Sequence, residues 1–177
     1  MDIYQQLKAD HDRQRNLMAA VVEACADLEA RRRLFHDLCA ELDAHAAAEE
    51  QTFHAALLTL SKDHECIRQR VAEHDEIAAL IADLASAGLD DPAWLCRFKA
   101  FKDKVGHHLD KEELDDFALA RRHLDDGRAA MLGERFATIK CSETAQWGTA
   151  LLASHLLLSL DGLASFSAFP GLMDLPP

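Results

Sequence analysis

Apolar side chains recur every three or four residues along four segments of the chain, a spacing typical of amphipathic helices. Given by their first and last apolar positions, the segments are 3–28, 34–57, 67–84 and 98–109. Breaks at Ser61, at Ala87-Gly88 and at Asp90-Asp91-Pro92 mark turns. Serine favours the start of a helix, glycine its end and proline its first turn. The pattern therefore predicts four helices joined by short connections.

No segment alternates apolar and polar residues as a strand would. A fifth helical piece, about 127–145, follows the break at Asp125-Asp126-Gly127, and the last thirty residues carry no clear pattern. Because short connections favour antiparallel neighbours, we expect an all-α protein. Its architecture would be an antiparallel up-down-up-down four-helix bundle with an additional C-terminal helical segment. Residues 1–140 would form the bundle, and 141–177 an apolar tail for packing or for an interface.

The composition suits a helical, globular chain and excludes some partners. Only 7 of 177 residues are glycine and 4 are proline, while 49% are hydrophobic. The net charge of −12 argues against a nucleic-acid partner. The longest uncharged run, 144–160, is shorter than the ~20 residues of a membrane span, so we expect none. Without a signal segment or a CxxC pair, we expect a cytoplasmic protein with reduced, mostly buried cysteines.

Six ionisable side chains lie on the apolar stripes of the predicted helices instead of on their polar faces. They are His11, His45, Glu49, His74, His108 and Glu112. His45, for example, follows Leu38 by seven residues, and Glu49 follows one turn later. Inside a bundle, ionisable groups are costly unless they are paired or bound to a metal ion.

The same six residues form a repeat. A shift of 63 residues relates the members of each pair, which are His11 and His74, His45 and His108, and Glu49 and Glu112. Residues equidistant from a hairpin turn lie at the same height. The midpoint of 74 and 108 is position 91, in a predicted turn, and that of 45 and 74 is 59.5, beside Ser61. Position 28, midway between 11 and 45, has no glycine or proline nearby. We expect all six side chains to meet at one level as a metal site.

A bundle with a buried histidine–glutamate hydrogen-bond network and no metal is the alternative interpretation. It requires every member of the network to be satisfied. For the other six histidines (36, 54, 64, 107, 123 and 155) we expect surface or packing roles. Glu50 and Glu113 would be solvated or would hydrogen-bond a ligand, and Tyr4 would serve packing or gating.

Imidazole and carboxylate groups without thiolates suit iron, manganese or zinc. Six ligands from four helices fit two metal ions bridged by two carboxylates. The ferritin-like di-iron pattern uses Glu-x-x-His, which the chain lacks, and it also lacks the His-Glu-x-x-His pattern of zinc proteases.

His11, His45-x-x-x-Glu49, His74 and His108-x-x-x-Glu112 together resemble the hemerythrin-like, or HHE cation-binding, domain. The resemblance covers about residues 1–140, including the segment 132–136. It implies a four-helix bundle with a non-haem di-iron centre, oxo- or hydroxo-bridged. The four histidines would be terminal ligands, and Glu49 and Glu112 would be bridging carboxylates.

Two departures from that family stand out. Oxygen-carrying hemerythrins have a fifth histidine one turn from a neighbouring histidine on the third helix, where this chain has Arg70 and Ala78. Many members also have proline after the Glu-Glu pair, where this chain has Phe53-His54 and Phe117-Ala118. The first departure argues against simple reversible oxygen carriage.

The predicted function is a di-iron protein that binds or senses a small oxidant (oxygen, nitric oxide or peroxide) or handles iron. Manganese and zinc are open as alternatives to iron. The enzyme alternatives are a di-iron peroxidase or oxidase and an iron-centre repair protein. The apolar tail would provide the surface for a homo-oligomer or a protein partner.

Overall fold

The computed structural model describes residues 1–62 and 64–158, with side chains to residue 149. Every regular element in these ranges is helical, as the sequence predicted. In chain order the elements are α1 (Ile3–Glu23), α2 (Leu28–Glu49), η1 (Glu50–His54), α3 (Ala55–Leu60), α4 (His64–Ser86), α5 (Trp94–Lys111), η2 (Glu112–Asp116), α6 (Phe117–Ala120) and α7 (Asp126–Leu158). The η segments are π-helices, in which the backbone bonds run from residue i to i+5.

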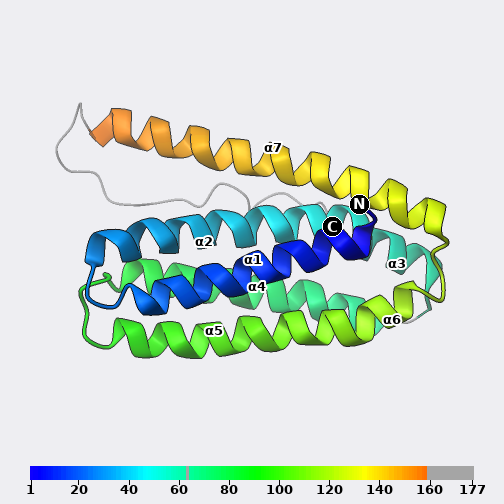
Figure 1. Ribbon diagram of the computed structural model, residues 1–177, viewed down its shortest axis with the longest axis horizontal. Helices are drawn as coiled ribbons and strands as arrows, with labels where there is room; N and C mark the ends of the chain where they lie inside the picture. Colours follow the sequence, from blue (N-terminus) through cyan, green and yellow to red (C-terminus); the bar gives the residue numbers. More distant parts are fainter. Residues whose placement is uncertain (63, 159–177) are drawn as a thin grey trace. The chain divides into compact units, whose positions relative to one another are not determined.

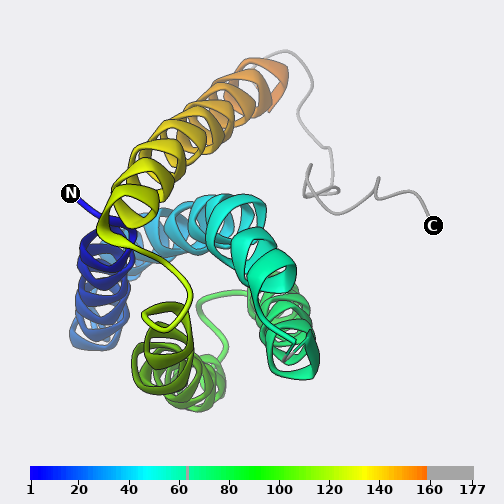
Figure 2. The same cartoon turned by 90° about the vertical axis from the view of Figure 1, so that its right-hand side faces the viewer.

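The two π-helices lie inside longer helical rods. The backbone stays in the right-handed helical region on both sides of each, at Glu49 and Ala55 and at Lys111 and Phe117. Residues 28–60 and 94–120 therefore form two continuous rods, which alternate in the chain with α1 and α4. In chain order, α1, residues 28–60, α4 and residues 94–120 are the four rods of the bundle. Figure 1 shows the rods side by side, and Figure 2 shows them around a common axis. The antiparallel four-helix bundle is confirmed.

Each rod packs on two neighbours. α1 contacts α2 and α5, and α4 contacts the same two rods from the other side. Apolar side chains fill the interior at the predicted helical spacing, among them Ile3, Leu7, Leu57, Ile67 and Phe53, all fully buried. Each such side chain contributes about 1.5–3 kcal/mol when it is removed from water.

Local signals fix where the helices begin and end. Asp2 and Gln5 form a capping box at the start of α1, and the Asp27 carboxylate accepts a hydrogen bond from the Ala30 amide at the start of α2. After α4, Gly88 adopts a φ of 73°, which favours glycine.

One sequence prediction on the connections was wrong. Leu28 was assigned to the first helix but begins α2, and it is exposed. The first turn is 24–27 and uses Asp27 as a cap, which explains why no glycine or proline marks it. The Ser61 amide closes the last turn of α3 on the Leu57 carbonyl, and its expected role as a cap of the third helix stays a prediction.

The chain forms two compact units, Met1–Thr144 and Ala145–Pro177. α7 belongs to both, because it continues to Leu158, past the expected end near residue 145. Its first half packs within unit 1, where Phe136 is buried and Gly133 lies against the backbone of Met1–Ile3. The division at residue 140 stays a prediction, and the tail from residue 159 lies outside the described residues.

None of the helices in the described part of the chain has the length and apolar character needed to cross a bilayer. The expectation that the cysteines are mostly buried was wrong. Cys25, Cys96 and Cys141 are exposed, since they lie in a turn or on outward positions of α5 and α7.

Candidate metal centre

Glu112, at the start of η2, faces histidines from both halves of the repeat. Its Oε2 lies 3.4 Å from Nε2 of His11, and its Oε1 lies 3.4 Å from Nε2 of His108. The carboxylate is fully buried. One carboxylate therefore spans two groups of imidazoles, which is the arrangement of a bridging ligand.

Glu49, at the end of α2, also faces histidines of both halves from the opposite rod, but through one oxygen. Its Oε2 lies 3.4 Å from Nε2 of His45 and 3.5 Å from Nε2 of His74. The structure thus brings all six predicted residues together in the bundle interior. Several triplets among them and their neighbours have ligand atoms within 4.8 Å of one another: His11, His45 and Glu112; His74, His108 and Glu112; Glu49, His54 and His74; His54, Glu112 and Asp116.

Each of the four predicted histidines is held at its other ring nitrogen by a carboxylate. The Nδ1–carboxylate distances, each 2.7–3.2 Å, join His11 to Glu113, His45 to Asp10, His74 to Glu50 and His108 to Glu73. An Nδ1–H that donates to a carboxylate leaves the Nε2 lone pair free for a metal and fixes the orientation of the ring.

These outer carboxylates follow the 63-residue repeat. Asp10 is equivalent to Glu73, and Glu50 to Glu113. Asp10 and Glu73 were missed as functional residues. Each directly precedes a histidine of the repeat, and this shared position is the sequence signal that could have identified them. Glu50 and Glu113 are only partly buried and hydrogen-bond the histidines, the second of the two roles expected for them.

His54 corrects the prediction that it has a surface or packing role. It is 1% exposed, and its Nε2 lies 3.8 Å from Glu49 Oε1 and 3.7 Å from Glu112 Oε1. In an unbroken α-helix, nine residues from His45 would place it on the opposite face. The π-helix η1 puts more residues in one turn, so that His54, five residues after Glu49, returns to the centre.

Phe117 is the residue equivalent to His54 in the repeat, 63 positions later. Its ring stacks on His11 at a centroid distance of 6.2 Å and an interplanar angle of 20°. The centre therefore has unequal ends. Three histidines (54, 74 and 108) lie toward one end, and His11 and His45 lie toward the other beside a phenylalanine.

The inward-facing atoms fit a cation better than a hydrogen-bond network. Both carboxylate oxygens of Glu49 and of Glu112 are buried and have no hydrogen-bond partner among the described residues. The same holds for Nε2 of four histidines, His11, His45, His54 and His74. Buried polar atoms without partners are strongly unfavourable, and a metal ion satisfies all of them together. The alternative of a satisfied metal-free network is therefore disfavoured by this geometry.

The charge balance also favours cations. Burial and the nearby charge of Glu49 raise the pKa of Glu112 well above its ordinary value. Burial opposes ionisation of Glu49 as well, yet the surrounding histidines, led by His54, hold the pKa of Glu49 well below normal. Burial lowers the pKa of His54 to about 4, which leaves a neutral imidazole, the form that binds metals. Positive ions between the two carboxylates would allow both to ionise.

Arg70, at one of the positions where oxygen carriers have histidine, does not face the ligand atoms as a histidine would. Its buried guanidinium donates to Asp116 at 3.0 Å and to Glu73 at 3.1 Å. Glu73 in turn holds His108. Arg70 thus ties α4, and the outer carboxylate of Glu73 on that helix, to Asp116 of η2.

The first half of α7 reaches the centre from outside the bundle. Phe136 contacts the His45 ring edge-on at 5.9 Å. Lys140 forms ion pairs with Asp10, the carboxylate that holds His45, and with Glu41.

Comparison with known proteins agrees with this geometry. The family model for the hemerythrin HHE cation-binding domain matches residues 2–120. Uncharacterised proteins of Mycobacterium tuberculosis and Mycobacterium bovis are 29% identical over 138 residues, which is 77% of this chain and 84% of theirs. The crystal structure of a hemerythrin HHE cation-binding domain-containing protein from Mycobacterium kansasii superposes with a TM-score of 0.76 at 26% identity, covering 92% of this chain and 95% of that one.

Proposed function

Because this chain belongs to the hemerythrin HHE cation-binding family, we propose that its buried cluster holds two iron ions bridged by Glu49 and Glu112. The terminal ligands are His11 and His45 at one ion and His74 and His108 at the other. His54 joins the second pair as a fifth histidine. The protein acts in the cytoplasm, where it binds or senses a small oxidant such as oxygen, nitric oxide or peroxide.

One observation carries this proposal. Two buried carboxylates each face histidines of both repeat halves, and their four oxygens lack partners among the described residues. A single tetrahedral ion uses four ligands, whereas seven side chains converge here. Imidazole and carboxylate ligands without thiolate suit iron, with manganese and zinc as the competitors that metal analysis separates.

His54 also changes the argument about oxygen carriage. The absence of histidine at positions 70 and 78 had argued against an unequal centre with one open position. His54 supplies a histidine from the second rod, because η1 turns it inward. The two ends therefore carry three and two histidines, and reversible binding of a small ligand at the poorer end becomes a reasonable function.

When bound, reduced iron supplies electrons to a small oxidant. The chain's own residues prepare the place for it. Asp10, Glu50, Glu73 and Glu113 hold the histidines in the metal-binding tautomer. The bundle buries the reacting region and keeps bulk water away from it.

The test is metal analysis after anaerobic reconstitution with ferrous iron. We expect about two irons per chain, and a near-ultraviolet absorption band of a bridged di-iron unit on oxidation. His108→Ala should lose at least half of the bound metal. His107→Ala is the matched control, because His107 is the adjacent residue and is exposed, and it should load like the wild type.

Equal loading of His107→Ala and His108→Ala, or metal content near zero in the wild type, would refute the proposal. If the protein binds another metal ion stoichiometrically and does not bind iron, the assignment of iron to the centre is refuted. Continuous consumption of peroxide by the wild type, lost in His108→Ala, would assign a peroxidase-like enzyme in place of a sensor or carrier.

A further inference from the structure

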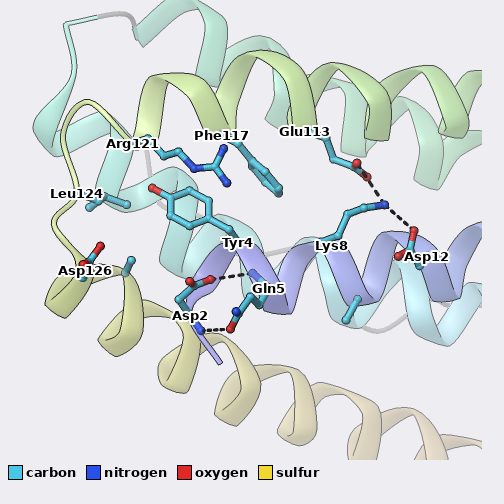
Figure 3. A pocket seen from close by; sticks show the side chains of 12 residues that line it. Asp2, Tyr4, Gln5, Lys8, Asp12, Glu113, Phe117, Arg121, Leu124 and Asp126 are labelled. Atoms are coloured by element: carbon cyan, nitrogen blue, oxygen red, sulfur yellow. Dashed lines mark hydrogen bonds and ion pairs between the residues drawn. The ribbon is translucent and has the colours of Figure 1, made fainter.

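A pocket of about 1000 Å³ opens at the N-terminal end of α1, between that helix, the η2–α6 segment and the start of α7. Tyr4 and Phe117 form part of its wall, and Figure 3 shows both side chains reaching into it from opposite helices. Phe117 also stacks on His11. Two residues of the pocket lining, Phe117 and Glu113, therefore contact a predicted metal ligand directly.

The two aromatic rings that line the pocket, Tyr4 and Phe117, pack on a third ring, Phe53, which does not line it. Tyr4 contacts Phe117 at a centroid distance of 5.5 Å and Phe53 at 6.3 Å, and Phe53 contacts Phe117 at 5.9 Å. All three contacts are edge-to-face, the favourable geometry for aromatic rings. Phe53 and Phe117 are buried, whereas Tyr4 is half-buried and faces the pocket. We call Tyr4, Phe53 and Phe117 the aromatic layer.

The mouth of the pocket carries a negative balance of charge. Its charged lining residues are Lys8, Arg121, Asp2, Asp12, Glu113 and Asp126, which makes two cations against four carboxylates. Lys8 is further neutralised by ion pairs with Asp12 and Glu113, visible in Figure 3. Arg15 also pairs with Asp12 and Glu113, so carboxylates exceed cations by one. Small anions are therefore not attracted to the mouth, and any ion would lose its hydration in the aromatic layer.

We propose that this pocket is the entrance to the metal centre and that Tyr4 and Phe117 form its gate, which admits small neutral molecules to the His11–His45 end. The inference rests on the proposed function. The repeat also supports an entrance at this end, because Phe117 occupies here the position that His54 fills at the other end. Neutral oxygen, nitric oxide or hydrogen peroxide passes with a small displacement of the rings, and a bulky or charged molecule does not.

The experiment compares two neutral peroxides on the reduced, iron-loaded full chain by stopped-flow absorption in the near ultraviolet. Hydrogen peroxide and cumene hydroperoxide undergo the same reaction, in which two electrons from the two ferrous ions and two protons cleave the O–O bond. Hydrogen peroxide gives two water molecules, and cumene hydroperoxide gives one water molecule and the alcohol. The two probes differ chiefly in size, and comparing the ratio of their rates between variants cancels any difference in intrinsic reactivity. We expect the wild type to react with cumene hydroperoxide at least about 10-fold more slowly, a barrier difference of about 1.4 kcal/mol.

Widening the gate should remove this discrimination. In Phe117→Ala, and in Phe117→Leu should the alanine variant fold poorly, the two rates should come within about threefold of each other, less than 1 kcal/mol of barrier difference. Phe117→Trp should slow both peroxides. Tyr4→Phe keeps the ring and should behave like the wild type, whereas Tyr4→Ala should behave like Phe117→Ala.

Phe98→Ala serves as the control for a loosened core. Phe98 is a fully buried aromatic that packs with Trp94 and Phe35 and does not line the pocket, so its loss should leave the ratio of rates unchanged. A ratio unaffected by every change at Phe117 and Tyr4, or altered equally by Phe98→Ala, overturns the gate. Metal content is measured on each sample. A protein that does not load metal contradicts the proposed centre, whereas a loaded protein with unchanged rate ratios contradicts the entrance alone.

Discussion

At the scale of single residues, the pair His54 and Phe117 decides how the two ends of the centre differ. The two occupy equivalent positions of the repeat and both are buried. One presents a nitrogen to Glu49 and Glu112, and the other presents an apolar ring to His11. A single exchange of side chain at either position should therefore change one end while the rest of the ligand set stays in place.

Phe117→His should make the two ends alike. The new imidazole would stand beside His11, with access to the ion held by His11 and His45, and would take the position that an exogenous ligand needs. We expect metal content to be retained, and the rate of reaction of the reduced protein with oxygen to fall by about tenfold or more, a barrier increase of at least 1.4 kcal/mol. Metal analysis and stopped-flow absorption on the same sample check both expectations.

Phe117→Leu provides the comparison, since it removes the ring without adding a ligand, and it should not slow the reaction. Unchanged or faster oxidation of Phe117→His would contradict the assignment of the open position to this end.

The outer carboxylates belong to the same scale. The sequence located the six inward-facing residues because each lies on an apolar stripe and recurs after 63 residues. Asp10 and Glu73 share that recurrence, but they lie one residue from the stripe, where acidic residues are common on any exposed helix face. Their hydrogen bonds with His45 and His108 depend on how each rod is rotated about its axis relative to its neighbour. The apolar pattern of a single helix carries no information on that rotation.

At the scale of elements, the π-helices set the limit of what helical periodicity can predict. An α-helical count fixed the four rods, their order and the level of the site, because the spacing of 3.6 residues holds over most of each rod. The count fails across η1 and η2, where the bonding changes from i+4 to i+5. His54 was misplaced for this reason alone, and no residue in segment 50–54 is diagnostic of the change.

α7 provides a test of packing at this scale. A Cβ added to Gly133 would lie 2.5 Å from the Met1 carbonyl oxygen and 2.9 Å from the Ile3 amide nitrogen. Neither backbone atom can move without displacing the start of α1, so Gly133→Ala should destabilise unit 1 by about 1–3 kcal/mol. Urea unfolding followed by circular dichroism measures the loss.

Gly148→Ala is the matched control in the same helix. No described atom lies within 4 Å of its added Cβ, so the better helix propensity of alanine should raise stability by up to about 1 kcal/mol. A neutral effect of Gly133→Ala would contradict the close contact between α7 and the N-terminus.

At the scale of the whole molecule, metal binding at the proposed centre should be linked to the stability of the bundle. The metal-free interior contains two carboxylates and several imidazole nitrogens without partners among the described residues, and each such group costs about 1–3 kcal/mol. A metal that binds only the folded chain therefore stabilises it by mass action, and the contacts that satisfy these atoms contribute to the affinity that sets the size of this effect.

Removing the metal with a chelator should lower the free energy of unfolding. At a free-metal concentration 100-fold above Kd, the expected loss is about 2.7 kcal/mol for each ion bound. Urea unfolding curves of loaded and chelated protein, measured at the same pH, provide the comparison. The His108→Ala protein should show a smaller difference between the two conditions, and superimposable wild-type curves would contradict the linkage.

The repeat also bears on how such a centre can become unequal at all. Each helical hairpin contributes two histidines, one inward glutamate and its own outer carboxylates, so two identical hairpins related by a twofold axis would enclose the same core set. In such a homodimer every substitution appears twice, and both ends must stay identical. Joining the halves in one polypeptide removes that constraint, and position 54 can carry a ligand while position 117 carries a phenylalanine. Covalent linkage of the two hairpins is thus the condition under which one end can be specialised for holding metal and the other for receiving a guest molecule.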